Sequence, residues 1–329
     1  MVQAKDILLS AQAGAVVLPV CDHYSGVELR MRKSLALQAD MHEEFGACVF
    51  DVTLDCEDGA PVGGESEHAH MVAEMANAAV LASGGKARVA VRVHPVDHPH
   101  FAQDMAIIAG KAGNALCHIM LPKVESPQDV DIAKKVAMSA SGRHIPLQVL
   151  IESPAAVHRA FDIAAHPALQ SLSFGLMDFV SAHAGAIPAQ AMTSQGQFEH
   201  PLVIRAKLEI ASACHAHGKV PAHGVVTEFA DAAKMQAAAA RASRELGYTR
   251  MWSIHPSQIR PILAAFAPTD AEIDSACAIL DAAQTAQWAP ISHGGALHDR
   301  ASYRYYWQVI ERAHRTGHAL DTRIAYFFN

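Results

Sequence analysis

The chain has 329 residues, of which 51% are hydrophobic and 18% are charged, and its formal net charge is −7 with histidine neutral. This balance excludes a disordered or collagen-like chain. The acidic charge, without any block of lysine and arginine, argues against nucleic acid or an anionic membrane surface as a partner. The length fits either two domains or one α/β barrel of about 250 residues with an extension.

Two further features of the sequence indicate a cytoplasmic protein. No stretch reaches the roughly 18 apolar residues that a membrane span needs, and the N-terminal run MVQAKDILLSAQAG makes a poor signal peptide. The six cysteines are scattered without a CxxC motif, which is typical of reduced thiols in the cytoplasm. We therefore expect no membrane and no nucleic acid among the partners.

Short apolar runs alternate with longer helical patterns as far as Ile254. The apolar runs predict eight β-strands, at Ala15–Val20, Ala47–Asp55, Arg88–Val93, His118–Val124, Leu147–Glu152, Ser171–Phe174, Lys219–His223 and Arg250–Ile254. Segments rich in alanine and charged residues predict helices between most of them, at Glu28–Asp40, Glu67–Leu81, Pro127–Ser139, Pro154–Ala164, Val203–His217 and Phe229–Glu245. Eight strands alternating with helices favour a (β/α)8 (TIM) barrel over a doubly wound sheet.

The pattern changes toward the C-terminus. The Gly/Gln/Ser-rich segment Ala182–His200 predicts a long loop, a candidate lid or crossover. Beyond the last strand the pattern predicts helices and no strands, with a glycine-containing turn at Ser292–Leu297; the helices fall at Pro256–Phe266, Asp270–Gln287 and about Ala301–Arg315. We therefore expect a barrel domain over residues 1–267 and a C-terminal helical extension over residues 268–329.

Polar residues follow seven of the eight predicted strands. They are Asp55, Glu57 and Asp58 in LDCEDG, Arg92 in VRVH, Lys123 and Glu125 in LPKVE, Glu152 in LIES, Asp178 in SFGLMD, His223 in PAHG, and His255 and Gln258 in SIHPSQ. The carboxyl ends of all strands of a (β/α)8 barrel meet at one face, where catalytic groups lie. The sequence therefore predicts an active site at this face, although barrel rims are often polar without function.

Two of these carboxylates predict a metal site. Glu152 and Asp178 are about one barrel unit apart in sequence, so they belong at neighbouring strand ends. Like charges that lie close raise the pKa of one of them, and a divalent cation relieves the repulsion. Oxygen ligands favour Mg²⁺, or alternatively Mn²⁺, whereas a helix-capping role for each residue is the structural alternative.

At this point the residues resemble a known family. The runs LDCEDG, VRV, LPKVESPQDV, LIESPAAV, SFGLMDF and SIHPSQ occur in the order seen in citrate lyase β-subunit-like and malyl-CoA lyase enzymes, of the HpcH/HpaI aldolase–citrate lyase superfamily. The resemblance covers roughly residues 14–300. It implies a barrel with a C-terminal extension in a homotrimer or hexamer, Mg²⁺ on Glu152 and Asp178, and Arg92 holding a substrate carboxylate or oxo group.

The resemblance also points outside the strand ends. In such lyases an aspartate after a glycine-containing turn crosses into a neighbouring subunit's site, and in HGGALHDRASYR this residue is Asp299. Its structural alternative is the N-cap of the helix near Ala301. Arg30, Arg32 and Lys33 loosely match the family's basic helix, which would bind the phosphates of coenzyme A (CoA), although a solvated helix face is an equal interpretation.

Other residues have supporting or structural interpretations. We expect Glu57 and Asp58 to hold metal-bound waters or to orient Arg92, and Lys123 to pair with a carboxylate at the strand ends. His255 is expected to anchor the IHP turn. The run HPVDHPH looks like a transition-metal site, but its prolines and loop setting favour a solvated or substrate-lining loop.

The function implied is cleavage of a 3-hydroxyacyl thioester, of the citryl-CoA or malyl-CoA type, to acetyl-CoA and an oxo acid. The implied mechanism uses a metal-stabilised alkoxide and an enolate, with Asp299 as the acid that protonates the enolate carbon. The first strand lacks the family's Arg-Ser pair, and His223 replaces an aspartate, so the acyl group and its carrier, CoA or an acyl-carrier protein, stay open.

Two alternatives have different consequences. A pyruvate-type class II aldolase has a similar metal pair, but its second strand resembles DGEH, whereas this chain has DCEDG and no histidine there. A subunit of a citrate lyase complex could be inactive alone. Against a purely structural role stand Glu152, Asp178 and Arg92.

Overall fold

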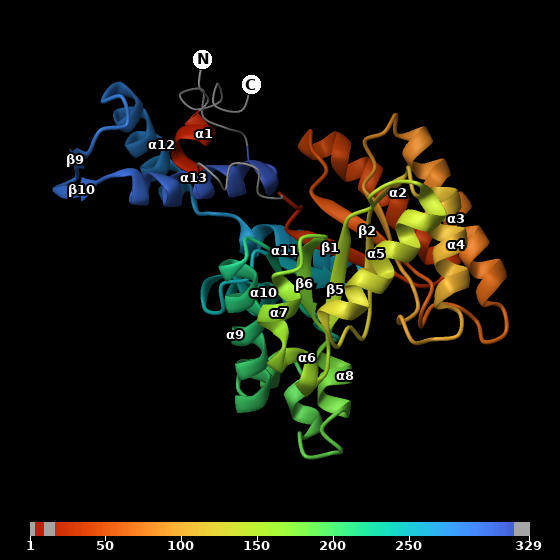
Figure 1. The fold of residues 1–329 in the computed structure, drawn as a ribbon. Helices are drawn as coiled ribbons and strands as arrows, with labels where there is room; N and C mark the ends of the chain where they lie inside the picture. Colours follow the sequence, from red (N-terminus) through yellow and green to blue (C-terminus); the bar gives the residue numbers. More distant parts are fainter. Residues whose placement is uncertain (1–3, 10–16, 319–329) are drawn as a thin grey trace.

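The computed structural model describes residues 4–9 and 17–318. Eight parallel strands close into a barrel in chain order, and β8 pairs back to β1 (Figure 1). The strands are β1 (Cys21–Ser25), β2 (Phe50–Asp55), β3 (Val89–Arg92), β4 (Leu116–Leu121), β5 (Leu147–Ile151), β6 (Leu169–Phe174), β7 (Val220–His223) and β8 (Arg250–Ser253). The predicted (β/α)8 barrel is confirmed.

The first strand lies later in the chain than predicted, so the prediction of Ala15–Val20 is wrong. Of that run, residues 15 and 16 lie outside the described residues, and the rest carries no strand. Pro19 has no N–H to donate to a neighbouring strand, which disfavours it inside a central strand. The polar run CDHYS forms β1 instead, because its buried Asp22 receives a hydrogen bond from Arg250 at 2.7 Å.

Helices cover the outside of the barrel (Figure 1). They are α2 (Glu28–Phe45), α3 (Glu65–Ala82), α4 (Phe101–Ala112), α5 (Pro127–Ser141), α6 (Pro154–His158), α7 (Ala160–Ala164), α8 (Leu176–Ser181), α9 (Pro201–Ala216), α10 (Ala232–Arg244) and α11 (Ile259–Phe266). Helix α4 was not predicted, although the helical spacing of Phe101, Met105 and Ile108, which are buried, indicates it. The single helix predicted at 154–164 is divided at Arg159.

The predicted loop at 182–200 contains two short 3-10 helices, Ala189–Met192 and Gly196–Phe198. The buried Lys207 of α9 ties this segment down, because its Nζ donates to the carbonyl and the side-chain oxygen of Gln197 at 2.9 and 2.8 Å. The crossover is therefore fixed to the barrel wall. No helix in the described part of the chain is long and apolar enough to span a membrane.

The C-terminal extension forms a second packed unit, which projects from the barrel (Figure 1). It contains α12 (Asp270–Thr285) and α13 (Arg300–Arg315), with the antiparallel hairpin of β9 (Ile291–His293) and β10 (Ala296–His298) between them. The expectation of a turn without strands is wrong, because Gly294 and Gly295, both at positive φ, close a hairpin there. The N-terminal helix α1 (Ala4–Leu9) packs into this extension's hydrophobic cluster.

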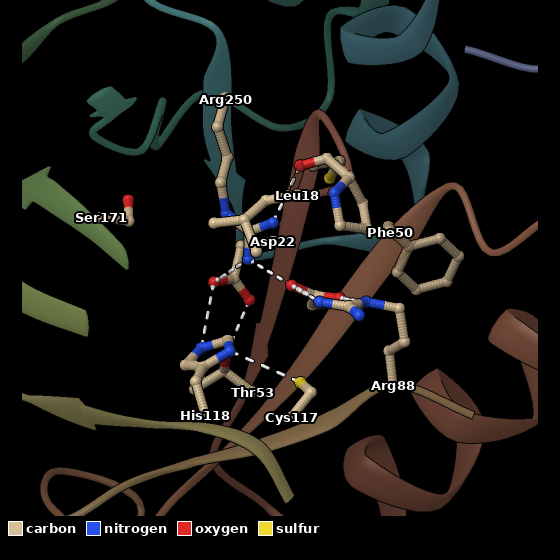
Figure 2. Close-up of polar contacts among 12 residues, drawn as sticks. Leu18, Asp22, Phe50, Thr53, Arg88, Cys117, His118, Ser171 and Arg250 are labelled. Atoms are coloured by element: carbon tan, nitrogen blue, oxygen red, sulfur yellow. Dashed lines mark hydrogen bonds and ion pairs between the residues drawn. The ribbon is translucent and has the colours of Figure 1, made fainter. Parts of the chain in front are cut away.

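The interior of the barrel changes character from one end to the other. At the amino ends of the strands, the buried Arg250 donates to Asp22 and Asp51 at 2.7 Å each, and Arg88 pairs with Asp51 (Figure 2). Burial alone would lower the pKa of Arg250, but the two carboxylates raise it. Above this ionic layer lies an apolar one, formed by Met120, Leu150, Ala222 and Trp252. The polar residues at the carboxyl ends therefore rest on an apolar floor.

Candidate active site

Arg92, the last residue of β3, is held at the carboxyl-end face of the barrel, called the rim below. Its Nε and Nη2 donate to the two oxygens of Asp55, the last residue of β2, at 2.6 and 3.0 Å. Tyr24 of β1 donates its hydroxyl to Asp55 Oδ2 at 2.5 Å, and its ring centroid lies 4.9 Å from the guanidinium carbon. Burial alone would raise the pKa of Asp55, but Arg92 and Tyr24 lower it. Three neighbouring strands thus fix the direction of the guanidinium.

The loop after β2 adds two more carboxylates to Arg92. Glu57 Oε2 lies 2.8 Å from Nη1, and Asp58 Oδ2 lies 2.9 Å from Nη2. The side chain of Glu57 is 7% exposed, whereas that of Asp58 is 72% exposed. Lys123, which follows β4, pairs its Nζ with the other oxygen of Glu57. The structure therefore brings Glu57, Asp58 and Lys123 around Arg92, whose nitrogens are all engaged by protein carboxylates.

Glu152 and Asp178 meet on the same rim. Glu152 follows β5 directly and is 6% exposed, and Asp178 lies exposed in the first turn of α8. Burial raises the pKa of Glu152 to about 8, and repulsion from Asp178 adds to the shift. The backbone N–H of Lys123 donates to Glu152 Oε1 at 2.6 Å, which favours the ionised form but does not offset burial.

Two backbone features give Glu152 its place. Gly175, between β6 and α8, lies against this carboxylate, and a β-carbon there would stand 2.4 Å from Glu152 Oε2. Only glycine leaves that space, because real β-carbons do not approach so closely. Lys123 adopts a left-handed φ of 51°, a conformation uncommon for residues other than glycine. From this position its N–H reaches Glu152 while its ammonium group reaches Glu57.

The donor set at Glu152 and Asp178 fits a hard divalent cation. Both side chains offer only oxygen, and burial and the charge of Asp178 raise the pKa of Glu152 despite the nearby charge of Lys123. Lys123, the nearest ammonium group, is engaged by Glu57. A divalent ion would supply the missing positive charge, and the exposure of Asp178 leaves room for water and substrate oxygens.

Asp299 does not join this rim within one chain. It caps α13, accepting from the backbone N–H groups of Ala301 and Ser302 at 2.9 and 3.4 Å. The other end of α13 lies against the amino ends of the strands, where Arg315 Nη1 is 3.4 Å from the carbonyl of Leu18, just before β1. Glu152 lies at the opposite, carboxyl ends. Asp299 can therefore contribute to such a site only in another copy of the chain.

The basic residues predicted to bind the phosphates of CoA, Arg30, Arg32 and Lys33, lie on the surface of α2. Arg32 pairs with Glu28 of the same helix at 2.8 Å, and both side chains are more than half exposed. Lys33 is also exposed. Because α2 begins soon after the carboxyl end of β1, these cations belong to the rim side of the barrel. In this structure they are a solvated helix face.

Two residues of the site were not predicted from the sequence, and the two histidines at strand ends make structural contacts. Tyr24 and Gly175 were not singled out; once β1 is placed at 21–25, the alternation of strand residues puts Tyr24 on the inner face with Asp22. His255 caps its turn through Ser257, with 2.7 Å between Nδ1 and Oγ, as expected of an anchor. His223 is wholly buried and stacks on Phe198, away from solvent.

The chain is similar to proteins of one enzyme family. Residues 34–256 match the family HpcH/HpaI aldolase/citrate lyase. An L-malyl-CoA/β-methylmalyl-CoA lyase of Cereibacter sphaeroides is 29% identical over 295 residues, covering 83% of this chain and 90% of that protein. A citrate lyase structure from Burkholderia xenovorans is 50% identical, with a TM-score of 0.80, covering 96% of this chain and 98% of that one.

A more distant structure shares the fold. CitE of Mycobacterium tuberculosis, solved with magnesium, acetoacetate and coenzyme A, is 20% identical with a TM-score of 0.67, covering 90% of this chain and 98% of that one. The family match spans more than half of the chain and includes the strand ends that carry the rim residues. The chain therefore belongs to the HpcH/HpaI aldolase/citrate lyase family and is a carbon–carbon lyase.

Proposed function

We propose that the protein cleaves a 3-hydroxyacyl thioester of the malyl-CoA or citryl-CoA type to acetyl-CoA and an oxo acid, with Mg²⁺ (or Mn²⁺) as cofactor. The observation that carries the proposal is the pair of Glu152 and Asp178 beside the clustered carboxylates of Arg92. The similarity to a malyl-CoA lyase supports a thioester substrate. The run DCEDG, which lacks the histidine of the pyruvate-type aldolases, favours the lyase over that alternative.

Glu152 and Asp178 are the residues that would hold the metal. Mg²⁺ bound there would polarise the hydroxyl and carboxylate oxygens of the oxo-acid half of the substrate. The chain itself orients the Glu152 carboxylate, because Gly175 leaves space for it and the N–H of Lys123 donates to it. The apolar layer beneath the rim also contributes, because it excludes water from that part of the barrel interior and so strengthens the charge interactions at the rim.

Arg92 would hold the carboxylate or oxo group of the substrate by exchanging one partner. Asp55 and Glu57 are buried and keep the guanidinium in place. Asp58 is 72% exposed, so its contact with Nη2 is the weakest constraint and the one that a substrate carboxylate can replace. Arginine suits this exchange because its planar donors accept a bidentate carboxylate.

The proton for the acetyl-CoA enolate carbon would come from Asp299 of a neighbouring subunit. Cleavage of the carbon–carbon bond leaves its electron pair on the acetyl half, which then needs an acid. Asp299 lies in an extension that packs at the far end of its own barrel, so the proposal requires an oligomer, which we expect to be a homotrimer or hexamer. Arg32 and Lys33 would face the phosphates of the CoA carrier.

A substrate assay tests the reaction. The full-length protein is mixed with malyl-CoA, β-methylmalyl-CoA or citryl-CoA, and the released oxo acid is trapped as a hydrazone and followed by absorbance. We expect cleavage of at least one thioester that requires Mg²⁺ and is lost in Glu152→Gln. Asp299→Asn should keep Mg²⁺ affinity and lower turnover by at least about a hundredfold. Cleavage of a free 4-hydroxy-2-oxo acid with no response to any thioester would favour the aldolase.

A mixing experiment tests the shared site. Glu152→Gln and Asp299→Asn subunits, each nearly inactive, are co-expressed with different tags, and mixed oligomers are purified. Every mixed trimer has one site in three with an intact Glu152 and an intact neighbouring Asp299, and random mixing in a hexamer gives about one site in four. Activity should therefore return to about a quarter to a third of the wild-type value. Mixed oligomers that stay inactive would contradict a site shared between subunits.

A further inference from the structure

We propose a second metal site, distinct from the rim carboxylates, at which His94, His98 and His100 bind one transition-metal ion such as Zn²⁺. The three residues lie in the loop between β3 and α4, the run HPVDHPH that the lyase activity leaves unexplained. This inference goes beyond the proposed function and does not depend on it.

The three imidazole rings lie together in space. The ring centroids of His94 and His98 are 4.3 Å apart, those of His94 and His100 are 5.6 Å apart, and those of His98 and His100 are 5.5 Å apart. Two imidazoles that share a tetrahedral zinc ion, with each nitrogen about 2 Å from it, have centroids about 5 Å apart. The observed separations bracket that value.

The ring of His94 is oriented as in histidine metal ligands. Asp104 of α4 accepts from the Nδ1 of His94 at 2.7 Å and from its backbone N–H at 2.9 Å. This carboxylate–histidine contact fixes the ring and its tautomer, leaving Nε2 as the free ligand atom. His94 is 6% exposed and Asp104 is 1% exposed, so the packing of the fold holds the ring in this orientation.

The remaining two rings are accessible and can adjust. His98 is exposed, and the side chain of His100 is 38% exposed. His98 stacks on His94 with 10° between the ring planes, so its ring has to turn about its side-chain torsions to share an ion with His94. Pro95 and Pro99 restrict the backbone of the loop, and the N–H of His98 donates to the carbonyl of Pro95 at 2.9 Å, so the adjustment falls to the side chains.

A fourth donor also fits a cation. Glu65, the first residue of α3, holds the N–H of Gly63 with Oε1 and turns Oε2 toward His100, 3.9 Å from Nε2. Imidazole nitrogen selects Zn²⁺, Ni²⁺ or Cu²⁺ over Mg²⁺.

One group of potential metal ligands in the described residues, in the barrel interior, needs no ring to turn, yet it does not compete with the histidine cluster. Asp51, Cys117 and His118 lie close enough together to share an ion. However, Arg88 and Arg250 already neutralise Asp51 and its neighbour Asp22 (Figure 2), so a further cation there would be repelled. The charged partners of the histidine cluster are the carboxylates of Asp104 and Glu65, and His98 is exposed to solvent.

Calorimetric titration with Zn²⁺ tests the site in the full-length protein. Saturating Mg²⁺ is present throughout to cover the rim carboxylates. We expect one strong Zn²⁺ equivalent in the wild type, and a loss of affinity of at least about tenfold in the double variant His98→Ala/His100→Ala. Both positions are solvent-accessible, so the variant keeps the fold, which its circular dichroism and melting temperature verify. Co²⁺ should show the visible absorption of a tetrahedral site in the wild type and lose it in the variant.

Two controls separate this site from others. His144→Ala removes an exposed histidine elsewhere on the surface and should leave the Zn²⁺ affinity unchanged. Glu152→Gln should also leave it unchanged while removing the effect of Mg²⁺ on activity, so failure of this site and failure of the proposed function have different signatures. Unchanged Zn²⁺ binding in the double variant, loss of that binding in Glu152→Gln, or no strong equivalent in the wild type would each overturn the proposal.

Discussion

Binding of Mg²⁺ should expel a proton from Glu152 at neutral pH. The carboxyl group is 6% exposed and lies beside Asp178, and burial first, with that neighbouring charge second, raises its pKa from 4.5 to about 8. A metal binds only the ionised carboxylate. The ion must therefore displace the proton that the folded protein keeps in its absence.

The size of the effect follows from the raised pKa. With a value of about 8, roughly nine in ten Glu152 side chains are protonated near pH 7. Each Mg²⁺ bound near pH 7 should then release about 0.9 proton. The apparent affinity should rise about tenfold between pH 6 and pH 7 and level off above about pH 9.

Calorimetry in buffers of different ionisation enthalpy measures the released protons directly. The slope of the observed enthalpy against the buffer enthalpy gives the number of protons, and Glu152→Gln, whose amide does not titrate, serves as the matched control. Release of no proton near pH 7, or an affinity that is flat between about pH 6 and pH 8, would refute the reasoning that burial keeps Glu152 protonated.

The remaining predictions concern stability and backbone space. The pKa of Glu152 is higher in the folded than in the unfolded protein, so its stabilising contribution is complete below about pH 4.5 and is lost as the pH rises through about 8. The melting temperature of the metal-free protein should therefore fall across that window, and it should fall less in Glu152→Gln. Gly175→Ala places a β-carbon 2.4 Å from the Glu152 carboxylate and should weaken Mg²⁺ binding by about tenfold or more in calorimetry. Gly110→Ala, in α4, where a β-carbon comes no closer than 3.5 Å to its neighbours, should not. Arg250→Met leaves the buried carboxylate of Asp22 without its cation and should lower the free energy of unfolding in urea by about 3–5 kcal/mol. A loss below about 1 kcal/mol would show that the ionic layer contributes little.

The sequence by itself determined the barrel and most of its rim. Short apolar runs alternating with helical segments have few folded solutions, and a closed parallel barrel brings every strand's carboxyl end to one face. Arg92, Glu152 and Asp178 could therefore be predicted from the sequence to lie at the same face of the barrel. The long C-terminal helices were also evident, because their periodicity is local.

Only the tertiary structure decided where the first strand lies and what each rim residue contacts. The polar run CDHYS becomes a central strand because Arg250, more than 200 positions later, compensates Asp22 across the barrel. Likewise, the three carboxylates around Arg92, the raised pKa of Glu152 and the packing of the extension at the far end of the barrel depend on distances between segments remote in sequence. Hydrophobic periodicity reports which face of a segment is buried, whereas charge partners and burial depth are set only when the segments pack.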